Sequence, residues 1–331
     1  MLAARLHGAR DLRLVQEPDP VPGPGESLVR VDAVGICGSD LHWYLEGGIG
    51  DNVVTRPVVP GHEMGGTIVS GPRAGQRVAI EPAIPCGHCR YCLAGWVNLC
   101  PTCRFSGQDD VDGGFRQLMA WPDTLLSPVP DVMADEQVPL IEPLLICLHA
   151  ESLRPVRRGD QVAVVGCGPI GLLQIQVALL GEPARILAVE PLAHRRAAAL
   201  AAGATEAVDV GSPAAAEPVF DVVFDASGSP GAIDATVELA RPGGTVVLVG
   251  IPDHDSTTFK ASVARRKGLT FVLVRRSVPA NERAYRLIEA GRIRLGELVS
   301  HRLPLERSSE AFELAAARTG LKVIVEPARP G

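Results

Sequence analysis

QVAVVGCGPIG, residues 161–171, is a short apolar run that leads directly into a glycine-rich turn. Apolar residues continue through Leu172–Leu180, which predicts a strand, a tight turn and a buried helix in that order. In this setting Gly166 makes the turn, Gly168 lets phosphates approach the backbone, and Gly171 lets helix and strand pack closely. A GxGxxG pattern alone is weak evidence, but its position between strand and helix predicts a dinucleotide site.

Further apolar runs follow at regular intervals towards the carboxyl end. They are Arg185–Val189, Val219–Asp225, Thr245–Gly250 and Leu269–Val274, and His194–Ala202 has the alanine-rich composition of an intervening helix. Strands that alternate with helices predict an α/β fold with a doubly wound parallel sheet of the Rossmann type. Within it, 245–252 fits either an edge strand or a central strand.

The candidate cofactor contacts lie around this turn. The amino end of the helix would face a pyrophosphate, and Glu190, nineteen residues after Gly171, is placed to accept hydrogen bonds from the adenosine ribose. A carboxylate there favours NAD over NADP, although Glu190 also fits a surface residue at a strand end. His194, Arg195 and Arg196 fit either a phosphate site or a solvated helix face. The candidates are Gly166, Gly168, Pro169, Ile170, Gly171, Glu190, Arg195 and Val249.

The segments on either side of this region differ from it in composition and in hydrophobic pattern. Residues 1–146 are rich in Gly and Pro with short β-like runs at Ser27–Val34, Thr67–Val69 and Arg77–Ile80, which predicts an irregular, strand-rich, barrel-like domain. Near the carboxyl end, 281–290 and 308–317 are expected to be helices and 322–325 a strand. We therefore predict a first domain of residues 1–146 plus 280–331, into which a coenzyme domain of residues 147–279 is inserted.

Four cysteines in a C-x2-C-x2-C-x7-C run predict a structural zinc site in a lobe at about 82–104. They are Cys86, Cys89, Cys92 and Cys100. Thiolates suit zinc, and four of them leave no open coordination position. The alternatives are free buried thiols or disulfides; the spacing and the absence of a secretion signal favour metal binding in a reducing compartment, the cytoplasm. Cys103 has no assigned role, and Cys147 and Cys167 are expected in apolar surroundings.

Cys37, His62 and Glu63 form a second, dispersed set of metal donors. Zinc held by three protein ligands and water acts as a Lewis acid. Together with a nicotinamide cofactor, such a site predicts hydride transfer at an alcohol or carbonyl.

Composition argues against two other classes of protein. With a net charge of −6 and 21% charged residues, no basic surface indicates a nucleic-acid partner. The run Val162–Leu180 is about long enough to span a membrane. Its glycines, together with Gln174 and Gln176, favour strand, turn and buried helix instead, so no membrane partner is expected.

Throughout its length the chain resembles the zinc-containing medium-chain dehydrogenases. The motifs are GICGSD at 35–40, GHE at 61–63, the cysteine lobe, EPL at 142–144 and GCGPIG at 166–171, and CGSDLHWYLEGGIGD at 37–51 is most similar to the sorbitol (polyol) and idonate dehydrogenase branch. The resemblance implies a GroES-like catalytic domain with both zinc ions, a Rossmann domain, and a cleft between them. It also implies NAD-dependent oxidation of a polyol or sugar-acid alcohol by a homo-oligomer, either a dimer or a tetramer.

Residue roles follow from the same resemblance. Cys37 and His62 would be zinc ligands, and the third ligand is either Glu63 or Glu142. Asp40 would orient His62, and Ser39 and His42 would relay the proton. Simpler interpretations are a turn residue for Ser39, a surface histidine for His42, and structural carboxylates for Glu63 and Glu142.

The prediction of the substrate rests on weaker sequence signals. Trp43, Tyr44, Glu142 and Arg276 are candidate substrate contacts, whereas Ser277 and a shortened loop after Glu63 depart from the polyol branch. An arginine at the pocket mouth also suits a sugar acid. Dehydrogenases of threonine or of an aminocyclitol, and a non-catalytic cofactor-binding protein, are the alternatives.

Overall fold

The computed structural model of the chain describes residues 1–252 and 256–328. It divides into two compact units. The outer unit comprises Met1–Glu142, Asn281–Glu289 and Arg294–Gly331, and the inserted unit comprises Pro143–Ala280 and Ala290–Ile293. The boundary expected near 146 falls within helix α3 (Ile141–Leu153). Residues 253–255 and 329–331 of the predicted domains lie outside the described residues.

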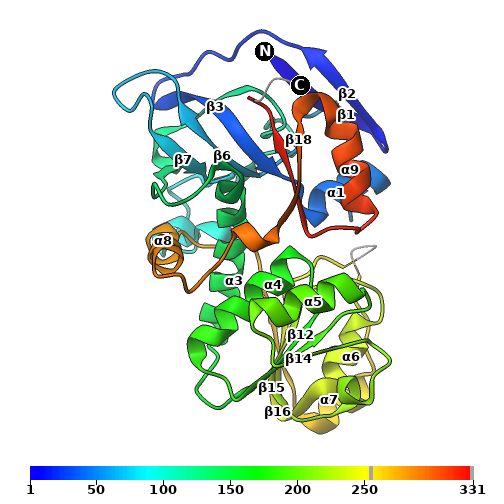
Figure 1. The fold of residues 1–331 in the computed structure, drawn as a ribbon. Helices are drawn as coiled ribbons and strands as arrows, with labels where there is room; N and C mark the ends of the chain where they lie inside the picture. Colours follow the sequence, from blue (N-terminus) through cyan, green and yellow to red (C-terminus); the bar gives the residue numbers. More distant parts are fainter. Residues whose placement is uncertain (253–255, 329–331) are drawn as a thin grey trace. The chain divides into compact units, whose positions relative to one another are not determined.

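The inserted unit is built on a six-stranded parallel sheet, with strand order β14-β13-β12-β15-β16-β17. This order, with helices between the strands, is that of a doubly wound dinucleotide-binding fold (Figure 1). The strands are β12 (Gln161–Val165), β13 (Arg185–Val189), β14 (Glu206–Val208), β15 (Phe220–Asp225), β16 (Ala240–Leu248) and β17 (Thr270–Leu273). The helices are α4 (Pro169–Ala178), α5 (Ala193–Ala202), α6 (Ala232–Leu239) and α7 (Ala261–Lys267).

All the predicted apolar runs are strands of this sheet, so the predicted fold class is confirmed. Only β14 was missed: its three residues are half-buried and do not form an apolar run. The run at 245–252 supplies the carboxyl-terminal end of β16, residues 245–248. This strand pairs with both β15 and β17 and is therefore an interior strand. The long apolar segment at 162–180 is split between β12 and the ten-residue α4. In the described part of the chain, no helix combines the length and apolarity that a membrane crossing needs.

The outer unit is built on a seven-stranded sheet with order β11-β7-β6-β3-β19-β18, in which β10 also pairs with β3. Its strands are β3 (Glu26–Gly35), β6 (Glu63–Ile68), β7 (Arg77–Ile80), β10 (Leu118–Pro122), β11 (Leu126–Pro128), β18 (Val299–Pro304) and β19 (Lys322–Glu326). Short two-stranded ribbons surround it: β1 (Leu2–Gly8) with β2 (Asp11–Gln16), β4 (Gly48–Ile49) with β5 (Asn52–Val53), and β8 (Ala83–Ile84) with β9 (Arg104–Phe105). Its helices are α1 (Gly38–Glu46), α2 (Arg90–Leu93), α8 (Asn281–Glu289) and α9 (Ser308–Ala316).

The carboxyl-terminal segment completes the core of the outer unit. Strand β19 pairs with β3 through Val325 and Ile324, and Phe312 of α9 packs against Phe115 and Tyr44 with ring centroids 5.2 and 5.0 Å away. Figure 1 shows α1 beside α9, two helices far apart in the sequence. This apolar packing fixes the position of α1 within the outer unit. It therefore also fixes the positions of the residues at the amino end of α1.

Candidate active site and metal centres

The first candidate ligand, Cys37, is the N-cap residue immediately before helix α1. Its backbone N–H donates to Asp40 Oδ2 at 2.9 Å, and this capping interaction starts the helix. Asp40 Oδ1 also accepts the N–H of Gly61 at 3.3 Å. The buried carboxylate of Asp40 therefore hydrogen-bonds both the loop that carries His62 and the start of the helix, where Cys37 lies.

His62 lies between two side chains of α1. Its Nδ1 is 3.4 Å from Asp40 Oδ1, and its Nε2 is 3.4 Å from Ser39 Oγ. Burial alone would lower the pKa of the imidazole, but the negative charges of Asp40 and Cys37 raise that pKa well above its ordinary value. The site therefore has a strong local preference for a cation, which either a proton or a metal ion can satisfy.

Glu63 opens strand β6 and is almost fully buried. Its Oε2 accepts a hydrogen bond from Lys322 Nζ at 2.5 Å, and Lys322 also donates to the carbonyl of Ile36 at 3.0 Å. A Cβ at position 35 would collide with Glu63 Oε2, so Gly35 leaves the space that this carboxylate occupies.

Glu142 is also buried, but it does not belong to the set of converging donors that Cys37, His62 and Glu63 form. Burial raises the pKa of its carboxyl group to about 8, an effect that positive His62 opposes and negative Glu63 and Glu81 reinforce. Glu142 is therefore a group that holds a proton at neutral pH when no metal is bound.

The donor atoms of Cys37, His62 and Glu63 all lie within 4.8 Å of one another. A thiolate, an imidazole nitrogen and a carboxylate oxygen are the ligand types found on zinc, and three protein ligands leave a fourth position open. The residues present thus fit a catalytic zinc ion.

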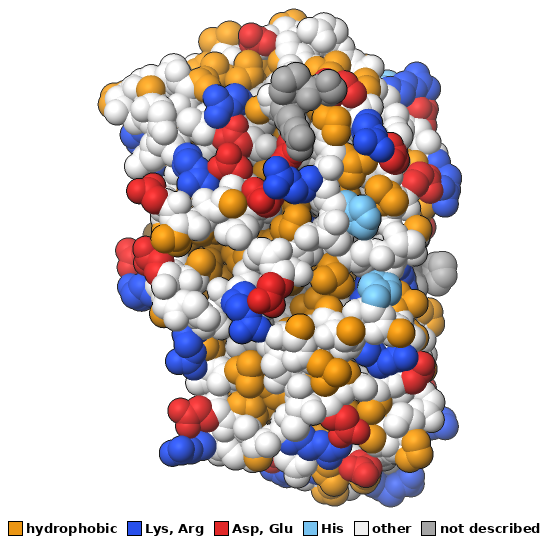
Figure 2. Space-filling view, viewed as in Figure 1, with side chains coloured by type: hydrophobic (Ala, Val, Ile, Leu, Met, Phe, Trp, Pro, Cys, Tyr) orange, Lys and Arg blue, Asp and Glu red, His pale blue; other side chains and the backbone are white. Residues whose placement is uncertain are grey.

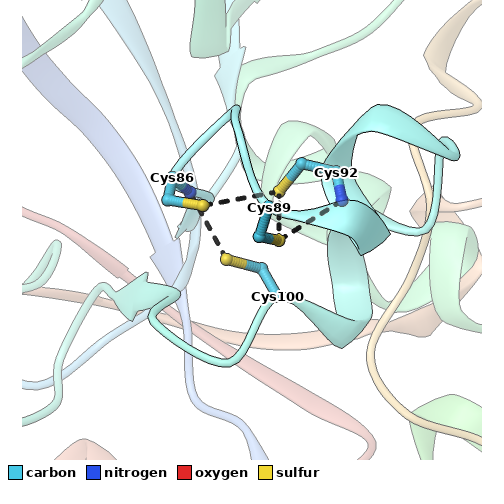
Figure 3. A group of neighbouring side chains, drawn as sticks. All are labelled: Cys86, Cys89, Cys92 and Cys100. Atoms are coloured by element: carbon cyan, nitrogen blue, oxygen red, sulfur yellow. Dashed lines mark hydrogen bonds between the residues drawn. The ribbon is translucent and has the colours of Figure 1, made fainter.

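The four cysteines of the lobe converge in the same way (Figure 3), and their sulfurs also lie within 4.8 Å of one another. Cys89 caps the short helix α2, where its Sγ accepts the N–H of Cys92 at 3.5 Å. Gly87 and Gly95 have φ angles of +76° and +82°, a left-handed conformation that glycine adopts without strain. The chain therefore turns tightly enough to bring four sulfurs together.

The ionisation of these thiols differs within the lobe. Backbone N–H groups, first that of His88, lower the pKa of Cys86 to about 6, whereas desolvation raises the pKa of Cys92 to about 12. Four adjacent thiolates repel one another unless a cation lies among them. The lobe therefore fits a divalent ion held by four sulfurs.

The glycine turn of the inserted unit has the geometry of a nucleotide cradle. A Cβ at Gly166 (φ +86°) would lie 2.7 Å from Ser227 Cβ, and a Cβ at Gly171 would meet the carbonyl oxygen of Gly166. Gly168, by contrast, caps α4 and has open space in front of it, with only Arg195 Nη1 near, 3.6 Å from where a Cβ would be. Two glycines serve packing and one leaves the helix terminus open to a phosphate.

Glu190 follows β13 and connects the turn to the next strand. Its Oε2 accepts the N–H of Cys167 at 2.8 Å and its Oε1 accepts that of Leu192 at 3.0 Å. Each carboxylate oxygen retains a second lone pair, so Glu190 can still accept a ribose hydroxyl. Val249 donates its N–H to the carbonyl of Asp225 at 2.9 Å, beyond the end of β16.

Comparison with known proteins agrees with this arrangement. Residues 23–131 match the alcohol dehydrogenase GroES-like domain, and residues 169–290 match the zinc-binding dehydrogenase domain. The chain belongs to the zinc-containing medium-chain dehydrogenases. It is an oxidoreductase near the sorbitol and idonate dehydrogenase branch of that family.

Three relatives illustrate the similarity. Sorbitol dehydrogenase of Bacillus subtilis (strain 168) is 31% identical and aligns over 99% of this chain and 98% of its own. L-idonate 5-dehydrogenase of Escherichia coli has a TM-score of 0.88 at 28% identity, covering 98% of this chain and 97% of that one. A zinc-binding dehydrogenase from Sinorhizobium meliloti 1021 bound to NADP has a TM-score of 0.89 at 31% identity, covering 98% and 99%.

The residues predicted to contact the substrate lie in different parts of the dehydrogenase. Trp43 and Tyr44 are buried in the core of the outer unit, and the Tyr44 hydroxyl donates to Glu313 at 2.8 Å. Arg276 follows β17 with a φ angle of +53°, a strained backbone conformation for a residue with a side chain. Substrate roles for these three residues stay predictions.

Lys322 is the site residue that sequence reasoning missed. It was expected only as the first residue of a strand, yet its amine reaches Glu63 across 259 positions of sequence. The one local signal is a lysine that opens the otherwise apolar run at 323–325, and such a lysine also fits a solvent-exposed strand end.

Proposed function

We propose that this dehydrogenase transfers a hydride from a secondary alcohol of a polyol or sugar acid to NAD and forms a ketone. The observation that carries the proposal is the convergence of half-buried Cys37 with buried His62 and Glu63, next to Ser39. Sorbitol dehydrogenase and L-idonate 5-dehydrogenase, to which the chain is similar over nearly its whole length, supply the substrate class.

Cys37, His62 and Glu63 would hold the catalytic zinc, with Glu63 rather than Glu142 as third ligand. Zinc supplies a Lewis acid that lowers the pKa of the alcohol, and NAD supplies the hydride acceptor. Asp40 keeps His62 oriented through its Nδ1. In this proposal Ser39 would take the proton of the alcohol, and His42 would pass it outwards.

Glu142 has a separate task in this proposal. Because it is buried and outside the donor set, it can hydrogen-bond the substrate hydroxyl rather than bind the metal. Arg276 would meet a hydroxyl or carboxylate further along the substrate chain, which suits a sugar acid as well as a polyol.

NAD is proposed as the cofactor because Glu190 presents a carboxylate where the adenosine ribose would lie. A carboxylate repels the additional phosphate of NADP. Arg195, which lies beside Gly168, would contact the pyrophosphate. The relative that binds NADP makes a direct comparison of the two cofactors necessary.

A second, structural zinc ion would be held by the lobe of Cys86, Cys89, Cys92 and Cys100.

A homo-oligomer, either a dimer or a tetramer, is proposed to form through the edge of the inserted sheet. Among the described residues, β17 pairs on one side only, with β16, and its Leu273 is 73% exposed. An unpaired edge with an exposed apolar side chain is a natural place for strand pairing between subunits.

A substrate panel tests the proposed function. The purified enzyme is given NAD or NADP with sorbitol, xylitol, idonate, threonine or an aminocyclitol, and formation of the reduced cofactor is followed by absorbance. We expect turnover of at least one polyol or sugar acid, with NAD preferred. Turnover of threonine or the aminocyclitol alone would contradict the proposal.

A further inference from the structure

The cysteine lobe is the loop of a short β ribbon. Strands β8 and β9 are two residues long each, and the segment between them, residues 85–103, carries the four converging cysteines. A ribbon this short is at best marginally stable by itself. A metal clip that closes a long loop contributes most to holding the ends of that loop together. A metal ion among the four sulfurs would therefore also fix the ribbon.

The second strand of the ribbon and its continuation contact the loop that carries His62. Phe105, the last residue of β9, has its ring centroid 5.4 Å from that of His62. Ser106 is fully buried, and its hydroxyl donates to the carbonyl of Gly61 at 2.9 Å. Its backbone N–H donates to the carbonyl of Pro82, just before β8, at 3.0 Å. The ribbon thus contacts both the imidazole of His62 and the peptide group that precedes it.

The peptide group between Gly61 and His62 has further contacts with the same segment of the chain. The Gly61 carbonyl also accepts the N–H of Gly114 at 3.0 Å. A Cβ at Gly107 would lie 2.9 Å from the backbone nitrogen of Gly61, so the chain after Ser106 runs closely against this loop. Loss of the Ser106 hydroxyl leaves the Gly114 hydrogen bond in place. We therefore expect such a change to shift the loop rather than to unfold it.

We propose that the β8–β9 ribbon couples the two metal centres. Closure of the cysteine lobe around its ion would hold Phe105 and Ser106 against the Gly61–His62 loop and so place the imidazole for the catalytic zinc. The inference rests on the two zinc sites of the proposed function and adds Phe105 and Ser106 to it as positioning residues. Groups that orient a metal ligand typically change metal affinity by about 10–100-fold.

Ser106→Ala tests the contact while the four cysteines stay in place. Ser308→Ala is the matched control, because Ser308 is also buried and its hydroxyl also donates to a backbone carbonyl, that of Leu305, at 2.5 Å. Zinc affinity is measured by competition with a chromophoric chelator, and the catalytic ion is identified as the one that Cys37→Ala lacks. We expect the catalytic affinity to fall about tenfold in Ser106→Ala and to stay unchanged in Ser308→Ala.

A spectroscopic measurement distinguishes positioning of His62 from a general loss of stability. With zinc kept in the cysteine lobe and cobalt(II) loaded at the Cys37 site, the visible absorption of cobalt reports the geometry of its ligands. We expect shifted absorption bands in Ser106→Ala and the wild-type spectrum in Ser308→Ala.

A second variant opens the lobe itself. Cys92→Ser removes one of the four sulfurs and should lose the structural ion, and Cys103→Ser is the control because Cys103 lies in the same segment but does not belong to the converging set. Cys92→Ser should also weaken catalytic zinc binding by about tenfold. In the Ser106→Ala background the same change should have a smaller effect, because both changes act through one contact.

An unchanged catalytic affinity or an unchanged cobalt spectrum in Ser106→Ala would overturn the proposal. So would a Cys92→Ser protein with wild-type catalytic affinity, or fully additive losses in the double variant. If Cys92→Ser does not fold, Ser106→Ala decides the question, since its lobe is intact. Failure of the proposed function gives a different pattern: the wild type would oxidise no polyol or sugar acid with NAD, whereas these affinities are measured without substrate.

Discussion

Lys322 Nζ lies 2.5 Å from Glu63 Oε2, and both side chains are almost completely buried, at 2% and 1% exposure. Strand β19 delivers the lysine and strand β6 the glutamate, with β3 between them. Burial alone would lower the pKa of Lys322, but the charges of Glu63 and Cys37 raise it. The carboxylate proposed to bind zinc is therefore already neutralised by a cation of the protein.

Replacement of Lys322 should lower the free energy of unfolding of the zinc-free protein more than that of the zinc-loaded protein. In Lys322→Met, Glu63 stays buried without its counter-charge, which typically costs about 3–5 kcal/mol. Bound zinc would supply the missing positive charge, so the zinc-loaded variant should lose less. Chemical denaturation with and without zinc measures both values, and exposed Lys260→Met is the control. Equal losses in the two metal states would contradict a shared role for Glu63.

Gly35→Ala probes the space that Glu63 needs. The added Cβ would collide with Glu63 Oε2, so the carboxylate must move, and overpacking of this kind costs about 1–3 kcal/mol. We expect weaker zinc binding at the catalytic site, while the zinc of the cysteine lobe is retained. Gly8→Ala is the control, because a Cβ there meets nothing within 4 Å. A Gly35→Ala protein whose catalytic site is fully occupied by zinc would refute the steric argument.

The raised pKa of Glu142 predicts a pH dependence of stability in the zinc-free protein. The carboxyl group is protonated in the folded state up to about pH 8, mainly because it is buried, but has its ordinary pKa of 4.5 when unfolded. The unfolded state therefore releases this proton first, and stability falls as pH rises from 4.5 to 8, by on the order of 3–5 kcal/mol.

Glu142→Gln should remove this decline, so the variant should gain stability relative to wild type at pH 8 but not at pH 4.5. Urea denaturation of the zinc-free proteins across this range measures the difference. Exposed Glu306→Gln should follow the wild-type curve. A wild-type stability that does not depend more steeply on pH than that of Glu142→Gln would show that Glu142 ionises freely.

Glu190→Ala should weaken NAD binding and reduce the preference for NAD over NADP. The variant loses acceptors for the N–H groups of Cys167 and Leu192 as well as the proposed ribose contact. Hydrogen bonds to charged groups contribute about 1.5–3 kcal/mol each, so kcat/KM for NAD should fall at least about tenfold. Steady-state kinetics with both cofactors provide the measurement, with exposed Glu217→Ala as the control. An unchanged cofactor ratio would remove Glu190 from the specificity site.

Local sequence patterns were sufficient for much of the fold and for the donor sets. Apolar runs such as Gln161–Val165 indicated the parallel sheet, and cysteine spacing indicated the lobe, because both depend on neighbouring residues. The Lys322–Glu63 pair could not be found in this way, since it depends on how distant strands align. The sequence also left Glu63 and Glu142 open as the third ligand, and the proposal of Glu63 depends on the fold, which brings its carboxylate within 4.8 Å of the donor atoms of Cys37 and His62.

The zinc content of the purified wild-type enzyme and of Cys37→Ala, measured by mass spectrometry of the metal, tests the central claim most directly. The proposed sites predict two zinc ions per chain in the wild type and one in Cys37→Ala, which should also lose alcohol oxidation. A Cys37→Ala protein that keeps two zinc ions and full turnover would show that Cys37, His62 and Glu63 do not form the catalytic centre.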